Sequence, residues 1–443
     1  MRTMPVSLGP RRPRRAALLF AALAAALGAA ACSGGGDPDL ERAPEPVVRD
    51  LARAGWAPDR EGLWSALRPP GSGAAQRAAG LESIGYADGY LAAPEERGVT
   101  LHDPARAFAG YNLAVSGHAP TAQLLDMQGR VVHSWSLPYD EVPGAPPVED
   151  PQLVDAWRYA RLLPGGELLA LYEGHALVKL DRSSHLLWAY NGRAHHALDV
   201  APDGSIYALA RRAALVPWVH PTEAVLADSV VQLSPEGEVL REVSVLGCFE
   251  RSPYRSLVEN RTAPYGDVLH TNAVVLLDGS LAEDMPAFRR GNVLISMRHT
   301  HALAVLDLDA GTVAWAATGM WKLQHDPRVL PNGRILLFDN AGYGWSSQVI
   351  EVDPRSARVA WAYRGSPPES FFSLFCGAAQ RLPNGNTLIT ESCQGRAFEV
   401  TRAGETVWSY RNPERAGPRG ELIAALFEVE RVPAAEVEAW LGR

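Results

Sequence analysis

Short runs of alternating apolar residues, separated by turns rich in Gly, Asn, Asp and Pro, recur along residues 110–431. Apolar residues at every second position are typical of half-buried β-strands, and two such runs around a tight turn predict a β-hairpin. One kind of hairpin is an apolar strand, a Pro-x-Gly turn and a second apolar strand, as in LDVAPDGSIYALAR and HDPRVLPNGRILLFDN. A second kind alternates with it along the chain.

The second kind of hairpin is a strand that ends near Asp, a short turn, and a strand that closes on Trp, as in LVKLDRSSHLLW and IEVDPRSARVAWAY. Five of its six copies carry the indole at the equivalent position: Trp135, Trp188, Trp315, Trp361 and Trp408. A large ring repeated once per unit favours packing between neighbouring units over cofactor binding.

One hairpin of each kind forms a four-stranded sheet, and such sheets in series predict a β-propeller. The sequence contains six hairpins of the second kind and five of the first. Residues 110–116 and 423–431 supply the missing strands from opposite ends of the repeat region, which would close the ring and remove its open edges. We therefore predict an all-β, six-bladed propeller over residues 108–432, closed by N- and C-terminal strands.

Residues 1–32 predict export. An Arg-rich start is followed by the apolar run AALLFAALAAALGAAA and then by Cys32, as in a secretion signal. The stretch GAAACSGGG resembles a bacterial lipoprotein box with Cys32 as the acylated residue. An ordinary cleaved signal peptide and a twin-arginine signal are the alternatives. The expected location is the periplasmic or extracellular side of the cell envelope, with a lipid anchor at Cys32.

The segments that flank the propeller are short. Residues 33–107 read as a Gly-rich tether followed by a partly helical lead-in segment, because PVVRDLARAG and GLWSALRPPG are apolar at helical spacing. Residues 433–443 form a C-terminal tail. Three inserts within the repeats are expected to be loops on a propeller face: 137–156, 243–269 and 279–290.

Charge and cysteine content bear on the possible partners and on a possible disulfide. The net charge is −8 and no basic stripe follows the first residues, which argues against a nucleic-acid partner. If Asn384 and Gly385 form a two-residue turn, Cys376 lies across from Cys393. In an exported protein that pair predicts a possible disulfide, and two buried thiols are the alternative.

Polar residues that could take part in catalysis cluster where the first-kind hairpins begin. In a propeller these innermost strands start beside the central channel, where several blades face one ligand. The positions concerned are His196, His270 with Asn272, Arg298, and His325. Strand alternation places His195 on the opposite face from His196, and Asp326 on the opposite face from His325. Asn340 is expected across the turn from His325, and His299 and His301 are read as structural.

The phrases MRHTHALAVLDLDAGTVAWA, QHDPRVLPNGRILLFDN and AQRLPNGNTLITESCQGRAFEVTRAGETVWSYRNP resemble the bacterial arylsulfotransferases that work without an activated adenylyl-sulfate donor. The resemblance covers roughly residues 108–432. It implies that a channel histidine takes a sulfuryl group from an aryl sulfate ester and passes it to a phenol. It further implies that His325 is the nucleophile and that His196, His270, Asn272 and Arg298 are its polar partners.

The chain departs from that family pattern in two places. A short N-terminal segment replaces a β-rich domain, and an extra loop lies between His270 and Arg298. The implied chemistry still suits the residues. A neutral imidazole is a competent nucleophile near pH 7, and Arg298 and Asn272 could hydrogen-bond the sulfuryl oxygens. His196 or His270 could act as general acid and then as base.

Two other functions fit parts of the sequence. AVLDLDAGTVAWA also resembles the Trp-docking motif of quinoprotein-type propellers, which allows a non-catalytic envelope lipoprotein that binds a partner. Three histidines could instead hold a metal in a propeller hydrolase, although no carboxylate stands beside the histidine clusters in the sequence. The first interpretation requires no cofactor and no metal, and its partners are a small aryl sulfate and a phenol.

Overall fold

The protein is described from a computed structural model. The structure describes residues 56–58, 64–66, 91–148, 154–261, 266–344, 346–417 and 419–442, all within the unit 42–443. The expected signal peptide, Cys32 and the Gly-rich tether lie outside the described residues. Export and acylation therefore stay predictions.

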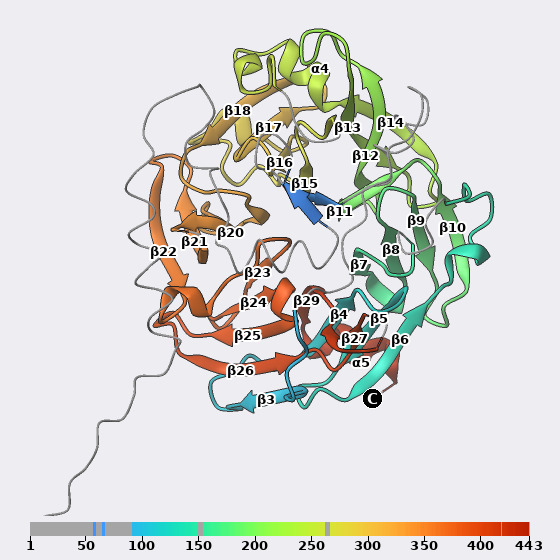
Figure 1. Cartoon of the computed structure of the whole chain (residues 1–443), viewed down its shortest axis with the longest axis vertical. Coiled ribbons are helices and arrows are strands. Elements are labelled where there is room, and N and C mark those ends of the chain that lie inside the picture. Colours follow the sequence, from blue (N-terminus) through green and yellow to red (C-terminus); the bar gives the residue numbers. More distant parts are fainter. Residues whose placement is uncertain are drawn as a thin grey trace, which may run out of the picture. The chain divides into compact units, whose positions relative to one another are not determined.

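Six antiparallel sheets are arranged as the blades of a propeller (Figure 1). Blade 1 contains β29 (Leu426–Val432), β4 (Tyr111–Ser116), β5 (Thr121–Leu125) and β6 (Val131–Ser136), and blade 2 contains β7 (Tyr159–Leu162), β8 (Leu168–Tyr172), β9 (Ala176–Leu180) and β10 (Leu186–Tyr190). Blade 3 contains β11 (Ala194–Val200), β12 (Ile206–Leu215), β13 (Ala224–Leu233) and β14 (Val239–Ser244), and blade 4 contains β15 (Thr271–Leu276), β16 (Val293–Met297), β17 (Ala302–Asp307) and β18 (Thr312–Thr318). Blade 5 contains β19 (His325–Val329), β20 (Ile335–Tyr343), β21 (Ser346–Asp353) and β22 (Arg358–Arg364), and blade 6 contains β23 (Ala378–Arg381), β24 (Thr387–Glu391), β25 (Arg396–Val400), β26 (Thr406–Arg411) and β3 (Gly98–His102).

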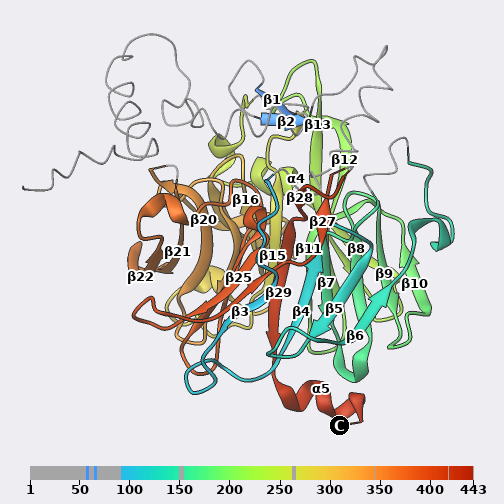
Figure 2. The same ribbon diagram turned by 60° about the horizontal axis from the view of Figure 1, so that its bottom comes forward.

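The ring is closed by the two ends of the repeat region, which confirms the predicted fold. In blade 1, β29 from the C-terminal end pairs with β4 from the N-terminal end, with Val432 opposite Tyr111. Every blade then has a neighbouring blade on each side, so the ring has no open end. Figure 2 shows β29 running on into the C-terminal helix α5 (Ala434–Leu441), so the expected tail is helical.

The tryptophans of the outer strands join neighbouring blades, as their periodic placement predicts. Nε1 of Trp135 in blade 1 donates to the carbonyl of Gly166 in blade 2, at 3.0 Å. Trp188 makes the same contact with Pro235 in blade 3, and Trp361 with Arg402 in blade 6. Trp408 in blade 6 donates to Met127 in blade 1, so this contact also crosses the point of closure.

The insert before β15 contains one of the helices of the described chain. The residues before β15 contain α4 (Val245–Glu250), whose first turn is capped by the hydroxyl of Ser244, and a short 3₁₀ turn at Arg255–Leu257. Within the expected partly helical lead-in, the described residues form strands: a short hairpin of β1 (Trp56–Pro58) and β2 (Trp64–Ala66), and β3, which pairs with β26 of blade 6. The other residues of that lead-in before 91 lie outside the described part.

A bulge interrupts the innermost strand of four blades near its start, including β29 between Leu426 and Glu428. The register also shifts between His195 and Leu198 in β11, between Thr271 and Ala273 in β15, and between His325 and Arg328 in β19. A bulge inserts an unpaired residue and turns the following side chains. Side chains at these positions therefore do not follow simple strand alternation.

The backbone is left-handed at or just before the start of the inner strand in blades 3 to 6. His196, His270, Asp326 and Cys376 have φ between 47° and 58°. Positive φ is uncommon for residues other than glycine and costs on the order of 1 kcal/mol or more, so the surrounding structure must hold it in place. These strained positions recur in four consecutive blades.

The hairpin of β23 and β24 differs by one residue from the expected register. Ala378 lies opposite Thr390, and the turn contains five residues rather than two. Extending this pairing places Phe375, not Cys376, across from Cys393, and the Cys393 thiol contacts the carbonyl of Phe375 at 3.3 Å. Both cysteines are buried free thiols in this structure, and the disulfide stays a prediction.

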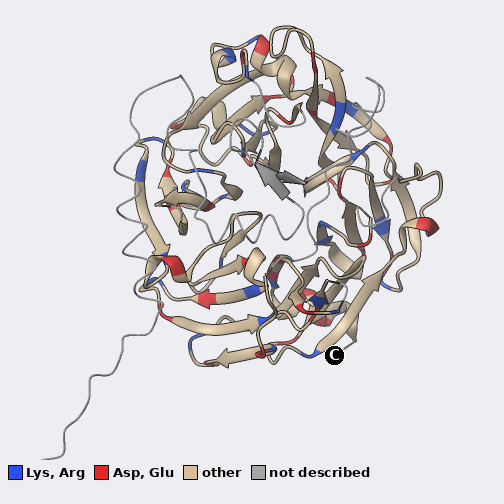
Figure 3. Ribbon diagram, in the orientation of Figure 1, with Lys and Arg blue, Asp and Glu red and all other residues tan. Residues whose placement is uncertain are grey.

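Charged residues of both signs are scattered around the blades (Figure 3). Within the part of the chain that the structure describes, no helix has the length and apolar character needed to cross a membrane.

Candidate active site

The starts of β11, β15 and β19 bring the histidines of three successive blades together. β15 lies against both β11 and β19. His196, His270 and His325 are buried, with exposed fractions of 2%, 7% and 3%. Asn272 and Arg298 are buried as well. The five predicted catalytic residues therefore share one buried region of the channel.

Asn340 contacts His325, but it is not the residue directly across the hairpin: the bulge in β19 shifts the register, and Phe338 lies opposite His325. Nδ1 of His325 lies 2.8 Å from Oδ1 of Asn340. The amide nitrogen of Asn340 donates to the carbonyls of Ser373 and Cys376, at 2.7 and 2.6 Å. Because that nitrogen is committed, the amide oxygen must face the ring and accept the Nδ1 proton. This arrangement selects the His325 tautomer with an unprotonated Nε2.

Nε2 of His325 has the features of a nucleophilic atom. It is buried, and it has no hydrogen-bond partner among the described residues. Burial, and secondly the positive charge of Arg298, hold the pKa of His325 well below the ordinary value of an imidazole. The ring is therefore neutral at pH 7, with its lone pair on Nε2. A buried nitrogen with an open lone pair is what a nucleophile requires.

Two arginines supply positive charge at this point. The guanidinium of Arg298 lies 5.6 Å from the ring centre of Phe375, and its backbone N–H donates to the carbonyl of His270. Arg158, which precedes β7, stacks its guanidinium over Phe427 at 5.0 Å. The charges of both arginines lower the pKa of His325, in addition to the larger effect of burial. An anionic group beside His325 would therefore meet two cations.

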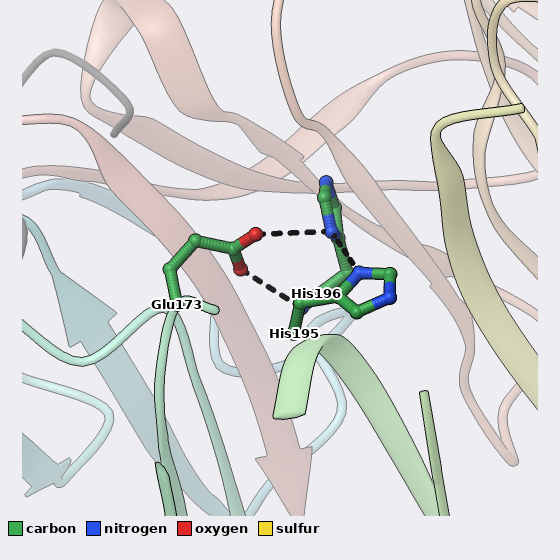
Figure 4. A group of neighbouring side chains, drawn as sticks. All are labelled: Glu173, His195 and His196. Carbon is green, nitrogen blue, oxygen red and sulfur yellow. Dashed lines mark hydrogen bonds and ion pairs between the residues drawn. The ribbon is translucent and has the colours of Figure 1, made fainter. Parts of the chain in front are cut away.

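His196 and His270 face each other through their Nε2 atoms, which are 3.2 Å apart. Behind His270, Nδ1 lies 2.5 Å from Oδ2 of Asp267. Behind His196, Oε1 of Glu173 lies 3.2 Å from Nδ1, and Oε2 accepts the backbone N–H of His196 (Figure 4). The two imidazoles thus lie between two buried carboxylates.

The matching family model describes arylsulfotransferases (ASST) and covers residues 160–413. The chain belongs to the arylsulfotransferase family. This match spans more than half of the chain and includes every predicted catalytic residue, so the protein is a propeller of sulfotransferase type. No curated protein matches this chain.

Several solved structures resemble this arylsulfotransferase-family chain. A protein of unknown function from Bacteroides caccae is 12% identical with a TM-score of 0.48, over 73% of this chain and 98% of that one. The WD40 β-propeller domain of Doa1 is 12% identical with a TM-score of 0.41, over 76% and 93%. A streptogramin B lyase is 10% identical with a TM-score of 0.42, over 76% and 93%.

Asn272 of this arylsulfotransferase-family site has a different contact from the one expected. Its amide nitrogen donates to the carbonyl of Gln324, at 2.8 Å, while its oxygen is buried without a hydrogen-bond partner among the described residues. Gln324 in turn donates to Ser296, Met297 and Ala302. Asn272 therefore anchors the residue before His325, and one amide hydrogen remains for another acceptor.

Two further histidines, His195 and His299, lie beside the site histidines. His195 does not face away from His196, because the bulge in β11 turns both rings inward, and their Nδ1 atoms are 2.8 Å apart. Nδ1 of His299 donates to the carbonyl of Asp267 at 2.5 Å, beside His270.

Asp326 behaves as expected from the sequence. Its carboxylate accepts from the guanidinium of Arg328 and from the backbone N–H of Ala379. Asp326 therefore does not orient the neighbouring His325.

Glu173, Asp267 and Arg158 were missed from the sequence. Glu173 directly follows β8, Asp267 ends the long insert before β15, and Arg158 precedes β7. Each stands outside the strand pattern that was used to find the site. The only sequence signal was at Glu173, a charged residue that directly follows the completely buried strand β8.

Two groups of side chains have the composition of a metal site. They are Glu173 with His195 and His196, and Asp267 with His270 and His299, and within each group the candidate ligand atoms lie within 4.8 Å of one another. The expectation that no carboxylate accompanies the histidines is therefore wrong. Arg211 lies 3.4 Å from Oε1 of Glu173, and a guanidinium so close opposes binding of a divalent cation.

Proposed function

We propose that the protein moves a sulfuryl group from an aryl sulfate ester to a phenol through an intermediate on Nε2 of His325. The observation that carries this proposal is the state of His325. Its Nδ1–H donates a hydrogen bond to Asn340, and its Nε2 is buried without a hydrogen-bond partner among the described residues. The charges of two arginines act on the ring. The family match supports sulfuryl transfer in general.

In the first half-reaction the lone pair of Nε2 attacks sulfur. The new N–S bond forms as the bond between sulfur and the aryl oxygen breaks, and the phenolate leaves. The leaving oxygen takes a proton from the His196–His270 pair. In the second half-reaction a phenol gives its proton to the same pair, its oxygen attacks sulfur, and the N–S bond breaks. The histidine returns to its starting state, so no cofactor is consumed.

The arginines stabilise the transferred group. Three sulfuryl oxygens share negative charge throughout the transfer, and preorganised cations in a buried site stabilise such charge more than water does. Arg298 is the expected partner from blade 4, and Arg158 is a second one from the start of blade 2. The remaining amide hydrogen of Asn272 could serve one oxygen, while its other contact keeps the backbone before His325 in place.

The decisive experiment compares the wild type with His325→Ala. Wild type incubated with p-nitrophenyl sulfate and a phenol should release nitrophenol and form the new aryl sulfate. His325→Ala should do neither, and only wild type should gain the mass of one sulfuryl group when acceptor is withheld. The control is His185→Ala, because His185 is exposed on the turn before β10. Full turnover by His325→Ala would end the proposal.

We also propose that the protein acts outside the cytoplasm, anchored by a lipid on Cys32. The support is the sequence alone, namely the Arg-rich start, the apolar run and the small residues before Cys32. Cells that express the full chain and are fed a labelled fatty acid should label the wild type and not Cys32→Ala. Equal labelling of both chains, or none of either, would contradict the anchor.

A further inference from the structure

Buried groups from three blades form one line of contacts. Oδ2 of Asp267 meets Nδ1 of His270 at 2.5 Å, and Nε2 of His270 meets Nε2 of His196 at 3.2 Å. Nδ1 of His196 then faces Oε1 of Glu173 at 3.2 Å and Nδ1 of His195 at 2.8 Å. All of these side chains are buried, so water does not set their protonation.

The contacts determine where protons reside. The two facing Nε2 atoms are in hydrogen-bond contact. Two lone pairs there would repel each other and two N–H groups would clash, so one proton lies between the rings. The outer nitrogens face acceptors: Nδ1 of His270 faces a carboxylate, and Nδ1 of His196 faces Glu173 and the ring of His195. With a proton on each outer nitrogen and one between the rings, the pair carries three protons and one positive charge.

The contacts place the shared proton on the His270 side of the pair. The carboxylate of Asp267 is in direct contact with that ring, whereas the charge of Glu173 is shared with Arg211, 3.4 Å away. Although burial opposes it, the charge and hydrogen bond of His270 hold the pKa of Asp267 well below its ordinary range. Burial lowers the pKa of His196 well below the usual value, which favours a neutral ring there.

We propose that Asp267 and Glu173 hold the His196–His270 pair as a store for one proton, and that His270 delivers it to the leaving phenolate. This inference rests on the proposed function and adds to it the two carboxylates that hold the proton on the pair. His270 and His196 are the catalytic residues of the store, and Asp267 and Glu173 are positioning residues that act through them.

The proton balance closes over the two half-reactions. When the S–O bond of the donor breaks, the Nε2 proton of His270 moves to the phenolate oxygen. His270 is then neutral, with Nδ1–H still donated to Asp267, and His196 can supply an Nε2 proton after tautomer exchange. When the acceptor phenol attacks, its proton returns to Nε2 of His270. The pair ends with the three protons that it had at the start.

The test compares two sulfate donors whose leaving groups differ in how much they need a proton. The anion of p-nitrophenol is stable enough to leave unprotonated, whereas phenolate, with a conjugate acid of pKa about 10, needs a proton. In Asp267→Asn the sulfation of His325 by phenyl sulfate should slow by about 100-fold, the usual scale of general acid catalysis. Sulfation by p-nitrophenyl sulfate should slow by less than about 10-fold. Rapid-quench intact mass gives both rate constants.

The controls separate this role from a structural one. Asp199→Asn changes a carboxylate on β11 that also accepts backbone N–H groups, from Val200 and Leu276, and should slow neither donor. If Asp267→Asn does not fold, His270→Gln should show the same dependence on donor. An equal loss with both donors, in whichever of the two variants folds, would overturn the inference. That result would leave the proposed function intact, because the latter fails only if His325 forms no sulfuryl adduct.

Discussion

Asn340 and His325 form a pair in which the amide dictates the state of the imidazole. The amide nitrogen of Asn340 is used by the carbonyls of Ser373 and Cys376, so its oxygen must accept the Nδ1 proton of His325. Those two carbonyls belong to the segment that leads into blade 6. The nucleophile of blade 5 is thus oriented by its neighbour in the ring, and the closed propeller supplies the rigidity.

Asn340→Ala tests this orientation. Removing the acceptor allows the His325 ring to rotate and to place its proton on Nε2, so sulfation should slow by about 10- to 100-fold, the equivalent of a buried hydrogen bond worth about 1–3 kcal/mol. The effect should fall on kcat rather than KM. ¹⁵N NMR of the His325 ring should show Nδ1–H in the wild type and a mixture in the variant. Asn384→Ala, at an exposed turn, is the control, and a wild-type rate in Asn340→Ala would contradict the assigned role.

Most of the fold and the chief site residues could be predicted from the sequence, because both follow from local patterns. Alternating hairpins identified six blades and the strands that close them. The site histidines stand at the same place in successive repeats, and a closed ring brings such places together. The contact between His325 and Asn340 was anticipated, but the counted offset was wrong, since Phe338 and not Asn340 lies opposite His325 in the ladder.

The rest depends on departures from regular strands. Counting from a two-residue turn misplaced Cys376 by one residue, since the turn contains five residues. Alternation placed His195 on the wrong side, since a bulge and the left-handed backbone at His196 turn both rings inward. Glu173 and Asp267 lie outside the strand repeats, and only the three-dimensional ring of blades shows which imidazoles they contact.

Arg298→Gln should have two separable effects. Loss of a cation that stabilises the sulfuryl group should slow transfer by about 100-fold. Because the charge of Arg298 adds to burial in lowering the pKa of His325, its removal should raise that pKa and move the acidic limb of the rate profile to higher pH. Single-turnover sulfation measured from pH 4 to 8 reports both effects. Arg212→Gln, on an exposed stretch of β12, should change neither, and an unmoved acidic limb in Arg298→Gln would contradict the proximity of the two residues.

Acid should destabilise the fold through the half-buried, neutral His299. Burial, and secondly the charge of His270, lower the pKa of His299 to about 3, whereas the unfolded value is about 6.5. Between these values the unfolded chain binds a proton that the folded chain does not, so the free energy of unfolding falls as the pH is lowered from about 6.5 towards 3. In His299→Gln this slope should decrease by up to about 1.4 kcal/mol per pH unit.

Urea unfolding at several pH values from 7.5 to 4 measures that slope. His185→Gln serves as the matched control because the ring is exposed, and it should retain the wild-type slope. A His299→Gln slope equal to that of wild type would show that this ring is protonated in the folded protein.

Closure of the ring should depend on one buried ion pair between blades 1 and 6. Nη1 of Arg431 on β29 lies 3.1 Å from Oε2 of Glu399 on β25, and Nε of Arg431 donates to Asn112 on β4. Both side chains of the pair are fully buried. Removing one partner leaves an uncompensated buried charge, so Arg431→Met should lower the free energy of unfolding by about 3–5 kcal/mol.

A double-mutant cycle distinguishes loss of the pair from loss of packing. Adding Glu399→Gln to Arg431→Met removes the charge left behind, so the double variant should recover part of the lost stability. Arg419→Ala removes an exposed arginine and should change the unfolding free energy by less than about 1 kcal/mol. Strictly additive effects of the two buried substitutions would mean that β29 is held by its ladder with β4 and not by this charge pair.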